Sequence, residues 1–241
     1  MAFERLLENP EKFRCGENYR ATNIVFPVEF ESKKYVIKKA GHLSSLANFY
    51  YALQDGLFYQ TRGVGTSFER LQREAACLEK LAGCGAPSVF AHNEDTIIRE
   101  FIEGTPFSNL SDLKRERALQ EGFRSLRRIH YKDVIIGDAH VKNILLSGYD
   151  AYWMDFEGYF YDQEKPATTL KAIDVLKFIY STYSETRDEK ITLRAAEIAR
   201  NHYEFNQNTV NLDLSALRLW FPTRIPLNGR LNKQIKKILL R

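Results

Sequence analysis

Short apolar stretches alternate with polar turns over the first hundred residues of the chain. Four of these stretches predict β-strands, at 24–30, 35–39, 88–91 and 96–102. The polar segment 31–34 predicts a hairpin turn between the first two. Between the two pairs, apolar residues recur every three or four positions from Phe68 to Ala82, which predicts a helix after a capping-box pattern at Thr66. We therefore expect an antiparallel sheet with one helix in this half of the chain.

The second half of the chain has mainly helical periodicity. From Asp112 onward, one face of a basic helix collects Leu119, Phe123, Leu126 and His130. Two short strands, 143–146 and 151–154, interrupt the helical pattern. Helices are predicted again after Thr169.

The break between these halves gives the predicted domain organisation. Glu103-Gly104 interrupts the apolar pattern directly after the fourth predicted strand. We predict a β-rich first lobe at 1–104, with an aromatic-rich, partly helical insertion at 41–65, and a helical second lobe at 105–241. The fold class expected from this order is α+β.

The composition of the 241 residues is that of a globular protein. Hydrophobic residues make up 44% and charged residues 27%, which excludes wholesale disorder. No apolar run reaches the roughly 18 residues that a membrane-spanning helix needs, and the N-terminus lacks the pattern of a signal peptide, so we expect a cytoplasmic protein. The three cysteines lack paired spacing, which excludes a disulfide framework and a four-cysteine zinc site.

Basic residues are concentrated at the C-terminus. The net charge is +4, and seven basic residues but no acidic residue follow Asp213. The segment 224–241 can form an amphipathic helix with Leu231, Ile235 and Ile238 on one side and cations on the other. Two interpretations are open. The helix docks on the protein, or it recruits RNA, an acidic protein surface or anionic lipid, and the lipid would place the protein at a membrane surface.

A carboxylate occupies the apolar side of the helix predicted in the first half. Glu74 follows Leu71 by three positions and precedes Leu78 by four, so helical geometry places it among buried residues. A buried carboxylate needs a cation. Lys38 or Lys39 can supply it, because adjacent strand residues point to opposite faces. Taken alone, the pattern favours a structural ion pair over a catalytic one.

The second half supplies the other groups that phosphoryl transfer requires. Asp138 ends an apolar run, Asn143 follows five residues later, and a predicted strand pair then leads to Asp155. Phosphoryl transfer uses a lysine on the nucleotide phosphates, a carboxylate near the attacking hydroxyl, and an amide and a carboxylate on magnesium. The joint occurrence of the lysine strand, the Glu74 helix and these three residues is far more specific than a D-x-x-x-x-N spacing alone.

These motifs resemble the protein-kinase-like superfamily, most of all the atypical RIO-type kinases and the small kinase subunit of the KEOPS complex. The segments that carry the resemblance are 73–87, 129–143 and 171–174, and the likeness covers about residues 13–183. The resemblance implies a two-lobed α+β fold with a five-stranded antiparallel sheet in the first lobe, an αC helix beside it and a shortened helical second lobe. It also implies that Asp174 braces the catalytic loop.

The resemblance implies roles for individual residues. Those assigned to ATP and magnesium are Lys38, Glu74, Glu100, Ile102, Asn143 and Asp155. Lys38 contacts the α- and β-phosphates with Glu74 as its partner, and Asn143 and Asp155 are the magnesium ligands. Asp138 is the implied catalytic aspartate.

Several departures from the family's pattern bear on the substrate. No G-x-G-x-x-G loop occurs, and only Gly16 stands where a phosphate-covering loop belongs. Ile136-Gly137 replaces the usual His-Arg, and Glu157 replaces the glycine after Asp-Phe. Only 19 residues separate Asp155 from Asp174, without an A-P-E motif, so we expect no standard peptide-docking platform.

Three functions follow from these observations. The first is an ATP- and magnesium-dependent phosphotransferase, Ser/Thr-kinase-like or an ATPase, that acts on or within a macromolecular assembly. The second is a sugar kinase. The missing platform and the separation of 36 positions between Lys38 and Glu74 resemble the kinases that phosphorylate Kdo or heptose of lipopolysaccharide cores. The third is a pseudokinase that binds nucleotide or a partner without turnover. The presence of Asp138, Asn143 and Asp155 argues against this third function.

Overall fold

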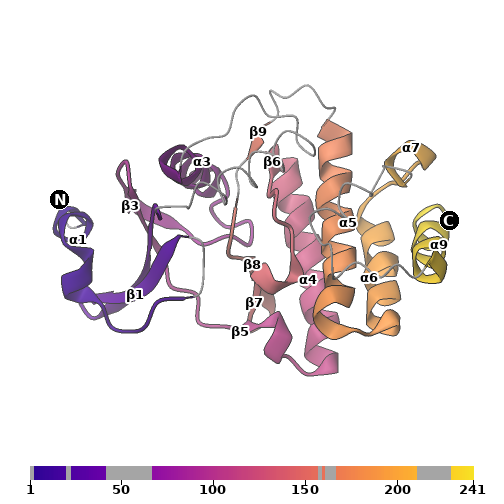
Figure 1. The fold of residues 1–241 in the computed structure, drawn as a ribbon, viewed down its shortest axis with the longest axis horizontal. Coiled ribbons are helices and arrows are strands. Elements are labelled where there is room, and N and C mark those ends of the chain that lie inside the picture. Colours follow the sequence, from indigo (N-terminus) through magenta and orange to yellow (C-terminus); the bar gives the residue numbers. More distant parts are fainter. Residues whose placement is uncertain (1–2, 20–22, 42–66, 157–158, 161–166, 211–228) are drawn as a thin grey trace.

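Two lobes lie side by side, a sheet-based lobe at the N-terminal end and a helical lobe at the C-terminal end (Figure 1). The structure, a computed structural model, describes residues 3–19, 23–41, 67–156, 159–160, 167–210 and 229–241. Outside these ranges lie nearly all of the predicted insertion at 41–65, the predicted capping residue Thr66, Glu157 and residues 224–228 of the C-terminal segment.

The first lobe is built on an antiparallel sheet. Its strands are β1 (Ile24–Phe30), β2 (Lys33–Lys39), β3 (Val89–His92) and β4 (Thr96–Glu100), in the order β1-β2-β4-β3. Phe26, Val28 and Phe30 of β1 are buried on one face, because side chains two positions apart share a face. The helix α1 (Glu4–Glu8) covers this face through Leu6.

The described sheet has four strands, whereas the sequence predicted five. The segment that precedes β1 pairs with it at only two isolated positions, Arg14 with Val28 and Tyr19 with Val25. The prediction of a fifth strand was therefore wrong for the described part of the chain. This segment contacts the edge of the sheet without forming a continuous ladder.

The hairpin between β1 and β2 closes more tightly than predicted. Strand pairing continues to Phe30 and Lys33, so only Glu31 and Ser32 form the turn. Both have positive φ values, 50° and 59°, as in the two-residue turns whose twist matches that of the flanking strands. This turn fixes the register in which Lys38 points inward.

The predicted helix is confirmed as α3 (Ser67–Lys80), which contacts both lobes (Figure 1). Leu71 packs on Ile97 of β4. Cys77 and Leu78 belong instead to the core of the second lobe. The helix therefore holds its side chains at a fixed position between the sheet and the second lobe.

Residues 101–104 connect the two lobes. They follow β4 and lead into β5 (Thr105–Pro106), which pairs with β7 (Ile144–Ser147) of the second lobe. A Cβ at Gly104 would lie 3.0 Å from the carbonyl oxygen of Leu146, which explains the glycine at this crossing. The boundary predicted from the sequence lies after residue 104, directly before β5.

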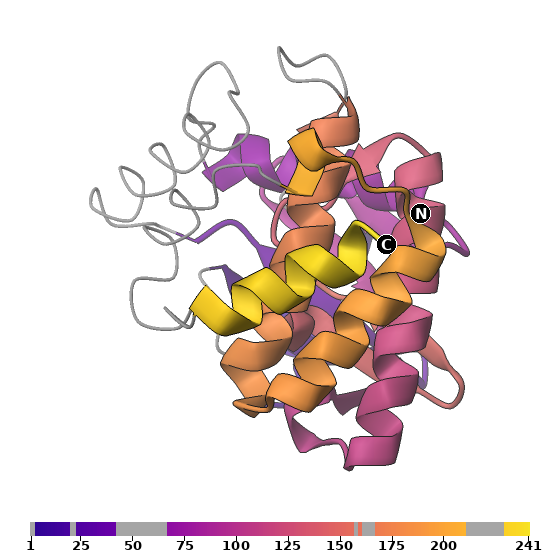
Figure 2. The ribbon, with the colours of Figure 1, turned by 90° about the vertical axis from the view of Figure 1, so that its right-hand side faces the viewer.

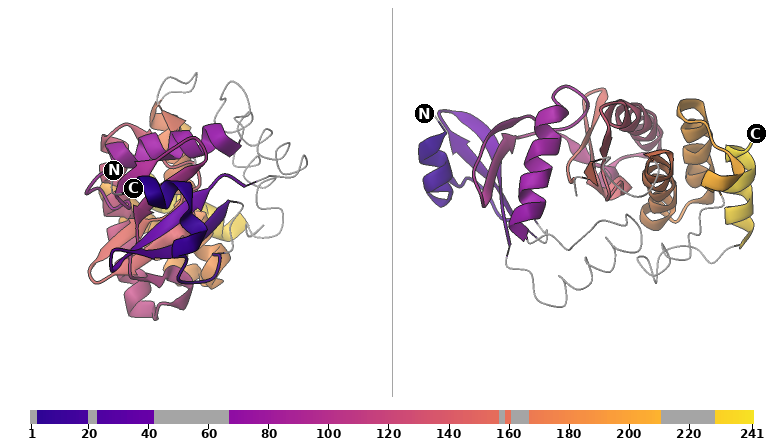
Figure 3. Two further views of the ribbon diagram at one scale, coloured as in Figure 1. Left: turned by 90° about the vertical axis from the view of Figure 1, so that its left-hand side faces the viewer. Right: turned by 90° about the horizontal axis from the view of Figure 1, so that it is seen from above.

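Three long helices form the second lobe, namely α4 (Asp112–Tyr131), α5 (Ala167–Thr186) and α6 (Glu189–His202). α6 packs against both α4 and α5. The hairpin of β7 and β8 (Asp150–Trp153) packs on α4 on the side that faces the first lobe (Figures 1 and 3). The shorter elements are η1 (Pro10–Phe13), η3 (Phe107–Asn109), η4 (Val141–Asn143), α7 (Gln207–Val210) and the paired strands β6 (Val134–Ile135) and β9 (Tyr159–Phe160). Within the described ranges, none of the helices has the length and apolar character needed to span a bilayer.

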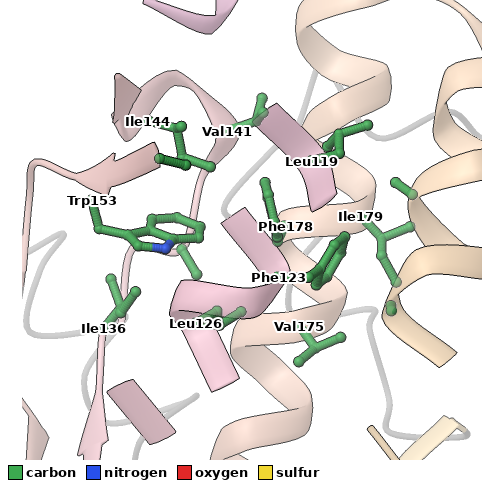
Figure 4. Close-up of a cluster of buried hydrophobic side chains, with 14 of the residues drawn as sticks. Leu119, Phe123, Leu126, Ile136, Val141, Ile144, Trp153, Val175, Phe178 and Ile179 are labelled. Atoms are coloured by element: carbon green, nitrogen blue, oxygen red, sulfur yellow. The ribbon is translucent and has the colours of Figure 1, made fainter. Parts of the chain in front are cut away.

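Aromatic side chains fill the centre of the second lobe (Figure 4). The ring centroids of Phe123 in α4 and Phe178 in α5 are 4.3 Å apart, and Trp153 of β8 lies 4.9 Å from Phe178. A Cβ at Gly122 would come within 2.8 Å of the Phe178 ring, so the glycine permits this close approach of the helices. The face predicted to be buried is confirmed for Leu119, Phe123, Leu126 and His130.

The C-terminal helix α9 (Gly229–Leu239) lies across α6 (Figure 2). Leu231, Ile235 and Ile238 pack on the core that includes α6, and Leu239 is buried with them. The interpretation of this segment as a docked helix is therefore confirmed for its described residues.

Candidate active site

A cavity of about 1010 Å³ opens between the two lobes. The sheet contributes Val25, Val36 and Glu100 to its lining, β7 contributes Leu145, and the connection at 101–104 also borders it. Its polar lining includes Lys38, Lys142, Asn143 and Asp155. A large concave site with apolar walls and a few polar groups is typical of a small-molecule binding site.

Lys38 is buried in the sheet and pairs with two carboxylates. Its Nζ lies 2.5 Å from Glu74 Oε2 and 2.7 Å from Asp155 Oδ1. Burial acts to lower the pKa of the ammonium, but the charges of Asp155 and Glu74 outweigh burial and raise the pKa, so the lysine stays charged. The choice between Lys38 and Lys39 is thereby resolved, because Lys39 points to the opposite face and is partly exposed.

Glu74 projects from α3 into the space between the lobes and is only 2% exposed. Besides Lys38, its carboxylate contacts Arg99, whose Nη1 lies 3.4 Å from Oε1. Burial raises the pKa of the Glu74 carboxyl, while the charges of Lys38 and Arg99 act in the opposite direction. The pairing that the sequence predicted between this helix and the lysine strand is present.

Arg99 is a member of this cluster that the sequence analysis did not identify. It lies on β4 with 5% of its surface exposed, and it donates a hydrogen bond of 2.6 Å to the carbonyl oxygen of Met154. The signal that could have identified it is the one arginine inside the apolar run 96–102, where Glu100 is the other charged residue. A buried arginine needs acceptors nearby, which would have pointed to Glu74.

Asp155 reaches the cluster from the second lobe, just after β8. Its side chain is 48% exposed and lines the cavity, and its Oδ1 accepts a hydrogen bond from Lys38. Partial burial acts to raise the pKa of this carboxyl, but the charges of Lys38 and Arg99 outweigh it and hold the pKa below its usual value. Asp155 is therefore ionised at neutral pH.

Asp138 and Asn143 are hydrogen-bonded to each other across the turn that ends in η4. The Asn143 amide nitrogen donates to the backbone carbonyl of Asp138 at 2.9 Å and to its Oδ2 at 3.0 Å. Burial raises the pKa of the Asp138 carboxyl, and the charges of Lys142 and Lys177 act against this rise. Asn143 lines the cavity, and Asp138 adjoins it through Asn143.

Asp174 of α5 holds the backbone that leads into Asp138. Its carboxylate is fully buried and accepts hydrogen bonds from the N–H groups of Ile136 at 2.8 Å and Gly137 at 3.1 Å. Lys177 donates to the carbonyl of Gly137 at 2.5 Å. Gly137 has a φ of 82°, a conformation that favours glycine. The bracing contact expected of Asp174 is therefore present.

Glu100 and Ile102 both line the cavity at the connection between the lobes. The Glu100 carboxylate accepts a hydrogen bond of 3.1 Å from the N–H of Ser88. The backbone N–H of Glu100 donates in turn to the Ser88 carbonyl. The Glu100 side chain is thus engaged outside the cavity. The nucleotide contacts expected of Glu100 and Ile102 stay a prediction, and for Glu100 they concern the backbone rather than the side chain.

A braced turn precedes Tyr19, at the position where the resemblance leads one to expect a glycine-rich loop. Arg14 Nε donates to the carbonyl of Gly16 at 2.8 Å, and Arg14 Nη2 donates to Asn18 Oδ1 at 2.8 Å. A Cβ at Gly16 would lie 2.7 Å from the Pro27 ring, so this glycine allows close packing on β1. Tyr19, which follows the turn, lines the cavity.

Asn143 and Asp155 provide oxygen donors of the kind that magnesium prefers. Among the residues that the structure describes, no group of three or more His, Cys, Asp or Glu side chains is placed to hold a metal ion. Mg²⁺ commonly takes one or two carboxylates from the protein and completes its coordination with substrate phosphates and water. The donor set therefore fits a Mg²⁺ ion that is bound together with a nucleotide.

Comparison with known proteins gives a likeness of fold and not of sequence. No protein-family model matches the chain, and no curated protein matches it. In contrast, 675 chains of solved structures match. One of them, described as WaaP in complex with acyl carrier protein, aligns with a TM-score of 0.51 at 14% sequence identity and covers 98% of this chain and 96% of that chain. The chain therefore has the two-lobed protein-kinase-like α+β fold that the sequence predicted.

Proposed function

We propose that the protein is an ATP- and magnesium-dependent phosphotransferase of the atypical kinase type. The observation that carries this proposal is the position of Lys38, whose ammonium lies at the cavity between Glu74 of the first lobe and Asp155 of the second. Phosphoryl transfer depends on such a lysine, held by a helix carboxylate next to a metal-binding aspartate.

The nucleobase of ATP occupies the apolar part of the cavity in this proposal. Val25 and Val36 line it from the sheet, and Leu145 lines it from β7. The backbone from Glu100 to Ile102 borders the same space and supplies hydrogen-bonding groups to the edge of the base.

Lys38 contacts the phosphates. Its ion pair with Asp155 links the lobes, so the arriving phosphate oxygens take the place of Asp155 while Glu74 keeps the ammonium in position. Asn143 and Asp155 hold magnesium, whose charge neutralises the charge that develops on the transferred phosphoryl group.

Asp138 orients the attacking hydroxyl and accepts its proton. Asn143 engages Oδ2, whereas Oδ1 is buried and has no hydrogen-bond partner within the described residues. Oδ1 is therefore the oxygen left for the acceptor's hydroxyl. The raised pKa of this carboxyl makes it a better proton acceptor.

The phosphate acceptor has two candidates. The sequence resemblance to RIO-type and KEOPS-subunit kinases favours a Ser/Thr-kinase-like activity or an ATPase activity within a macromolecular assembly. A sugar kinase acting on Kdo or heptose of a lipopolysaccharide core is favoured by the short path from Asp155 to α5, which begins only 12 positions later at Ala167. So short a segment leaves little chain for docking a peptide. A pseudokinase is disfavoured by the contacts that join Lys38, Asp138 and Asn143 to their partners.

Binding and turnover of ATP test the proposal. Calorimetric titration with a non-hydrolysable ATP analogue should show binding that strengthens with magnesium in the wild type and weakens strongly in Lys38→Met. Transfer of labelled phosphate should then be compared for peptides, Kdo and heptose, with hydrolysis measured alongside. A wild-type protein that does not bind the analogue in the presence of magnesium rejects the proposal, and binding without transfer or hydrolysis supports the pseudokinase instead.

We also propose that α9 binds an anionic partner of this cytoplasmic enzyme. Leu231 and Ile235 dock the helix, while Lys233, Lys237 and Arg241 are exposed. The helix contains no acidic residue to offset these charges. Because WaaP is described in complex with acyl carrier protein, a protein is one candidate beside RNA and anionic lipid, and the lipid would place this enzyme at a membrane surface.

A further inference from the structure

Arg99 occupies the same face of the sheet as Lys38. It lies on β4 directly opposite Val36 of β2, and Lys38 follows two residues along the same strand. An arginine as deeply buried as Arg99 destabilises a protein unless its donors are used, so its contacts define its role.

The Nη1 atom of Arg99 contacts groups from both lobes. It lies 3.4 Å from Glu74 Oε1 on α3, and it donates to the Met154 carbonyl at 2.6 Å. The N–H of Met154 donates in turn to the carbonyl of Asn143 at 2.8 Å. Met154 thus links the two proposed magnesium ligands, because its backbone is bonded to Asn143 and it directly precedes Asp155.

The cluster around Arg99 has balanced charge. Two cations, Lys38 and Arg99, face two carboxylates, Glu74 and Asp155. Lys38 pairs with both carboxylates, so a phosphate group that binds Lys38 weakens the ion pairs of Lys38 with Glu74 and Asp155. Arg99 keeps its contacts with Glu74 and with the Met154 carbonyl in that state, since neither partner is a proposed phosphate ligand.

We propose that Arg99 is a positioning residue for phosphoryl transfer, which holds Glu74 and the backbone before Asp155 at a fixed separation. This separation allows Lys38 of the first lobe and the magnesium ligands of the second lobe to contact the phosphates of the same nucleotide. The inference rests on the proposed function. It adds a residue that lines the cavity but whose Nη1 contacts are made to Glu74 and the Met154 carbonyl.

Substitution of Arg99 can distinguish a role in positioning Glu74 and the backbone before Asp155 from a role in binding the nucleotide. Arg99→Met keeps a long side chain but removes both contacts, whereas Arg99→Lys keeps a cation that reaches one of the two acceptors. Arg124→Met is the matched control, because Arg124 is an exposed arginine that pairs with Glu121 on α4. The three variants therefore compare loss of the contacts, partial retention and loss of an unrelated arginine.

The expected result is a split between kcat and KM. In Arg99→Met, kcat and the affinity for Mg²⁺ in the presence of ATP should each fall roughly 10- to 100-fold, the usual effect of losing a group that orients metal ligands. The KM for ATP and the affinity for a metal-free ATP analogue should change by less than about twofold, because the contacts that the variant loses are those to Glu74 and the Met154 carbonyl. A larger loss of either would show instead that Arg99, which lines the cavity, binds the nucleotide directly. Arg99→Lys should recover part of kcat, and Arg124→Met should match the wild type.

Hydrogen exchange of the nucleotide-free protein gives a readout that does not depend on turnover. The Met154 amide should exchange faster in Arg99→Met than in the wild type or Arg124→Met, because its bond to Asn143 loses support. If Arg99→Met does not fold, Arg99→Gln, which keeps a neutral donor, carries the same comparison.

Two further results overturn the inference, and they differ from a failure of the proposed function. An Arg99 variant that is less stable but keeps wild-type Mg²⁺ affinity makes the arginine a structural residue only, as does a variant with unchanged exchange of the Met154 amide. If the wild type neither binds nor turns over ATP, the proposed function fails first. In that case, unchanged exchange at Met154 still rejects the positioning contact.

Discussion

Lys38 and Asp155 are separated by 117 positions in the sequence and belong to different lobes, yet Lys38 Nζ and Asp155 Oδ1 lie 2.7 Å apart. Glu74 and Arg99 complete this bridge from the first lobe. Any anion that enters the cavity beside Lys38 competes with Asp155 for the ammonium. In the proposed function, binding of a nucleotide is therefore coupled to the contact between the lobes, because Lys38 takes part in both.

Asp138→Ala and Asp155→Ala should each abolish phosphate transfer while the protein stays folded. Loss of the group that orients and deprotonates the acceptor should lower kcat by roughly 10²- to 10⁴-fold in Asp138→Ala. Asp155 is half-exposed, and its removal leaves Lys38 paired with Glu74, so Tm should change little. Transfer of labelled phosphate, measured alongside thermal melting, checks both expectations.

Asp155→Ala should also remove the part of ATP binding that depends on magnesium. Titration of the wild type and the variant with an ATP analogue, with and without Mg²⁺, measures that part directly. Binding by the wild type that is indifferent to magnesium would contradict the assignment of Asn143 and Asp155 as its ligands.

Most of the first lobe could be predicted because its strands have a clear period of burial. The predicted strand at 24–30 coincides with β1, and the stretch 96–102 contains β4. The edge of the sheet could not be predicted in this way. The segment between Arg14 and Tyr19 pairs with β1 at only two positions, and such contacts depend on tertiary packing rather than on an alternating pattern.

The candidate site could be predicted where spacing along one element fixes the direction of a side chain. The helical period alone placed Glu74 among buried residues. The choice between Lys38 and Lys39 depended on which face of β2 meets α3, which is a tertiary property. Arg99 was missed because one arginine in an apolar strand is equally compatible with exposure, and only its contact with Glu74 distinguishes the two cases.

The protein should lose stability as the pH falls below about 6.5, because of His130. This histidine is buried between Asp174 and Tyr203, and burial lowers its pKa below the usual 6.5. Between the two pKa values the unfolded chain binds a proton that the folded protein does not, so acid favours unfolding. The free energy of unfolding should fall by up to about 1.4 kcal/mol per pH unit in that range.

Denaturant unfolding of the wild type and His130→Gln at several pH values from about 8 to about 5 isolates this contribution. The wild type should show the steeper dependence of the free energy of unfolding on pH. Equal slopes would assign the effect to other groups, such as His202, whose pKa is also lowered by burial.

Of the three cysteines, only Cys15 should react quickly with a thiol reagent in the folded protein. Cys15 is exposed, whereas Cys77 and Cys84 are buried. Burial, with Glu74 nearby, raises the pKa of the Cys77 thiol to about 12, so little reactive thiolate exists at neutral pH. A chromogenic disulfide reagent should detect one fast thiol before denaturation and three after it. A second fast thiol in the folded state would contradict the burial of Cys77 in α3 or of Cys84, which follows this helix.

The basic side of α9 can be altered without undocking the helix. Truncation after Asn228 would expose the surface that Leu231 covers, so a loss of binding by the truncated protein would have two explanations. A triple variant avoids this ambiguity, because Lys233→Gln, Lys237→Gln and Arg241→Gln change exposed residues only. Its free energy of unfolding should stay within about 0.5 kcal/mol of the wild-type value.

Binding of polyanions by this triple variant decides whether α9 recruits a partner. Each cation that contacts a phosphate adds about one unit to the slope of log affinity against log salt, so the variant should bind a tRNA-sized RNA more weakly at low salt and with a slope reduced by up to about three units. Anionic vesicles and a carrier protein, tested in parallel, identify the class of partner. The matched control is a second triple variant, Lys12→Gln, Lys114→Gln and Lys132→Gln, which removes the same charge from exposed positions elsewhere. If the control weakens binding equally, net charge accounts for the attraction. If the α9 variant binds RNA, vesicles and carrier protein as the wild type does, the helix is a docked terminal element without a partner of its own.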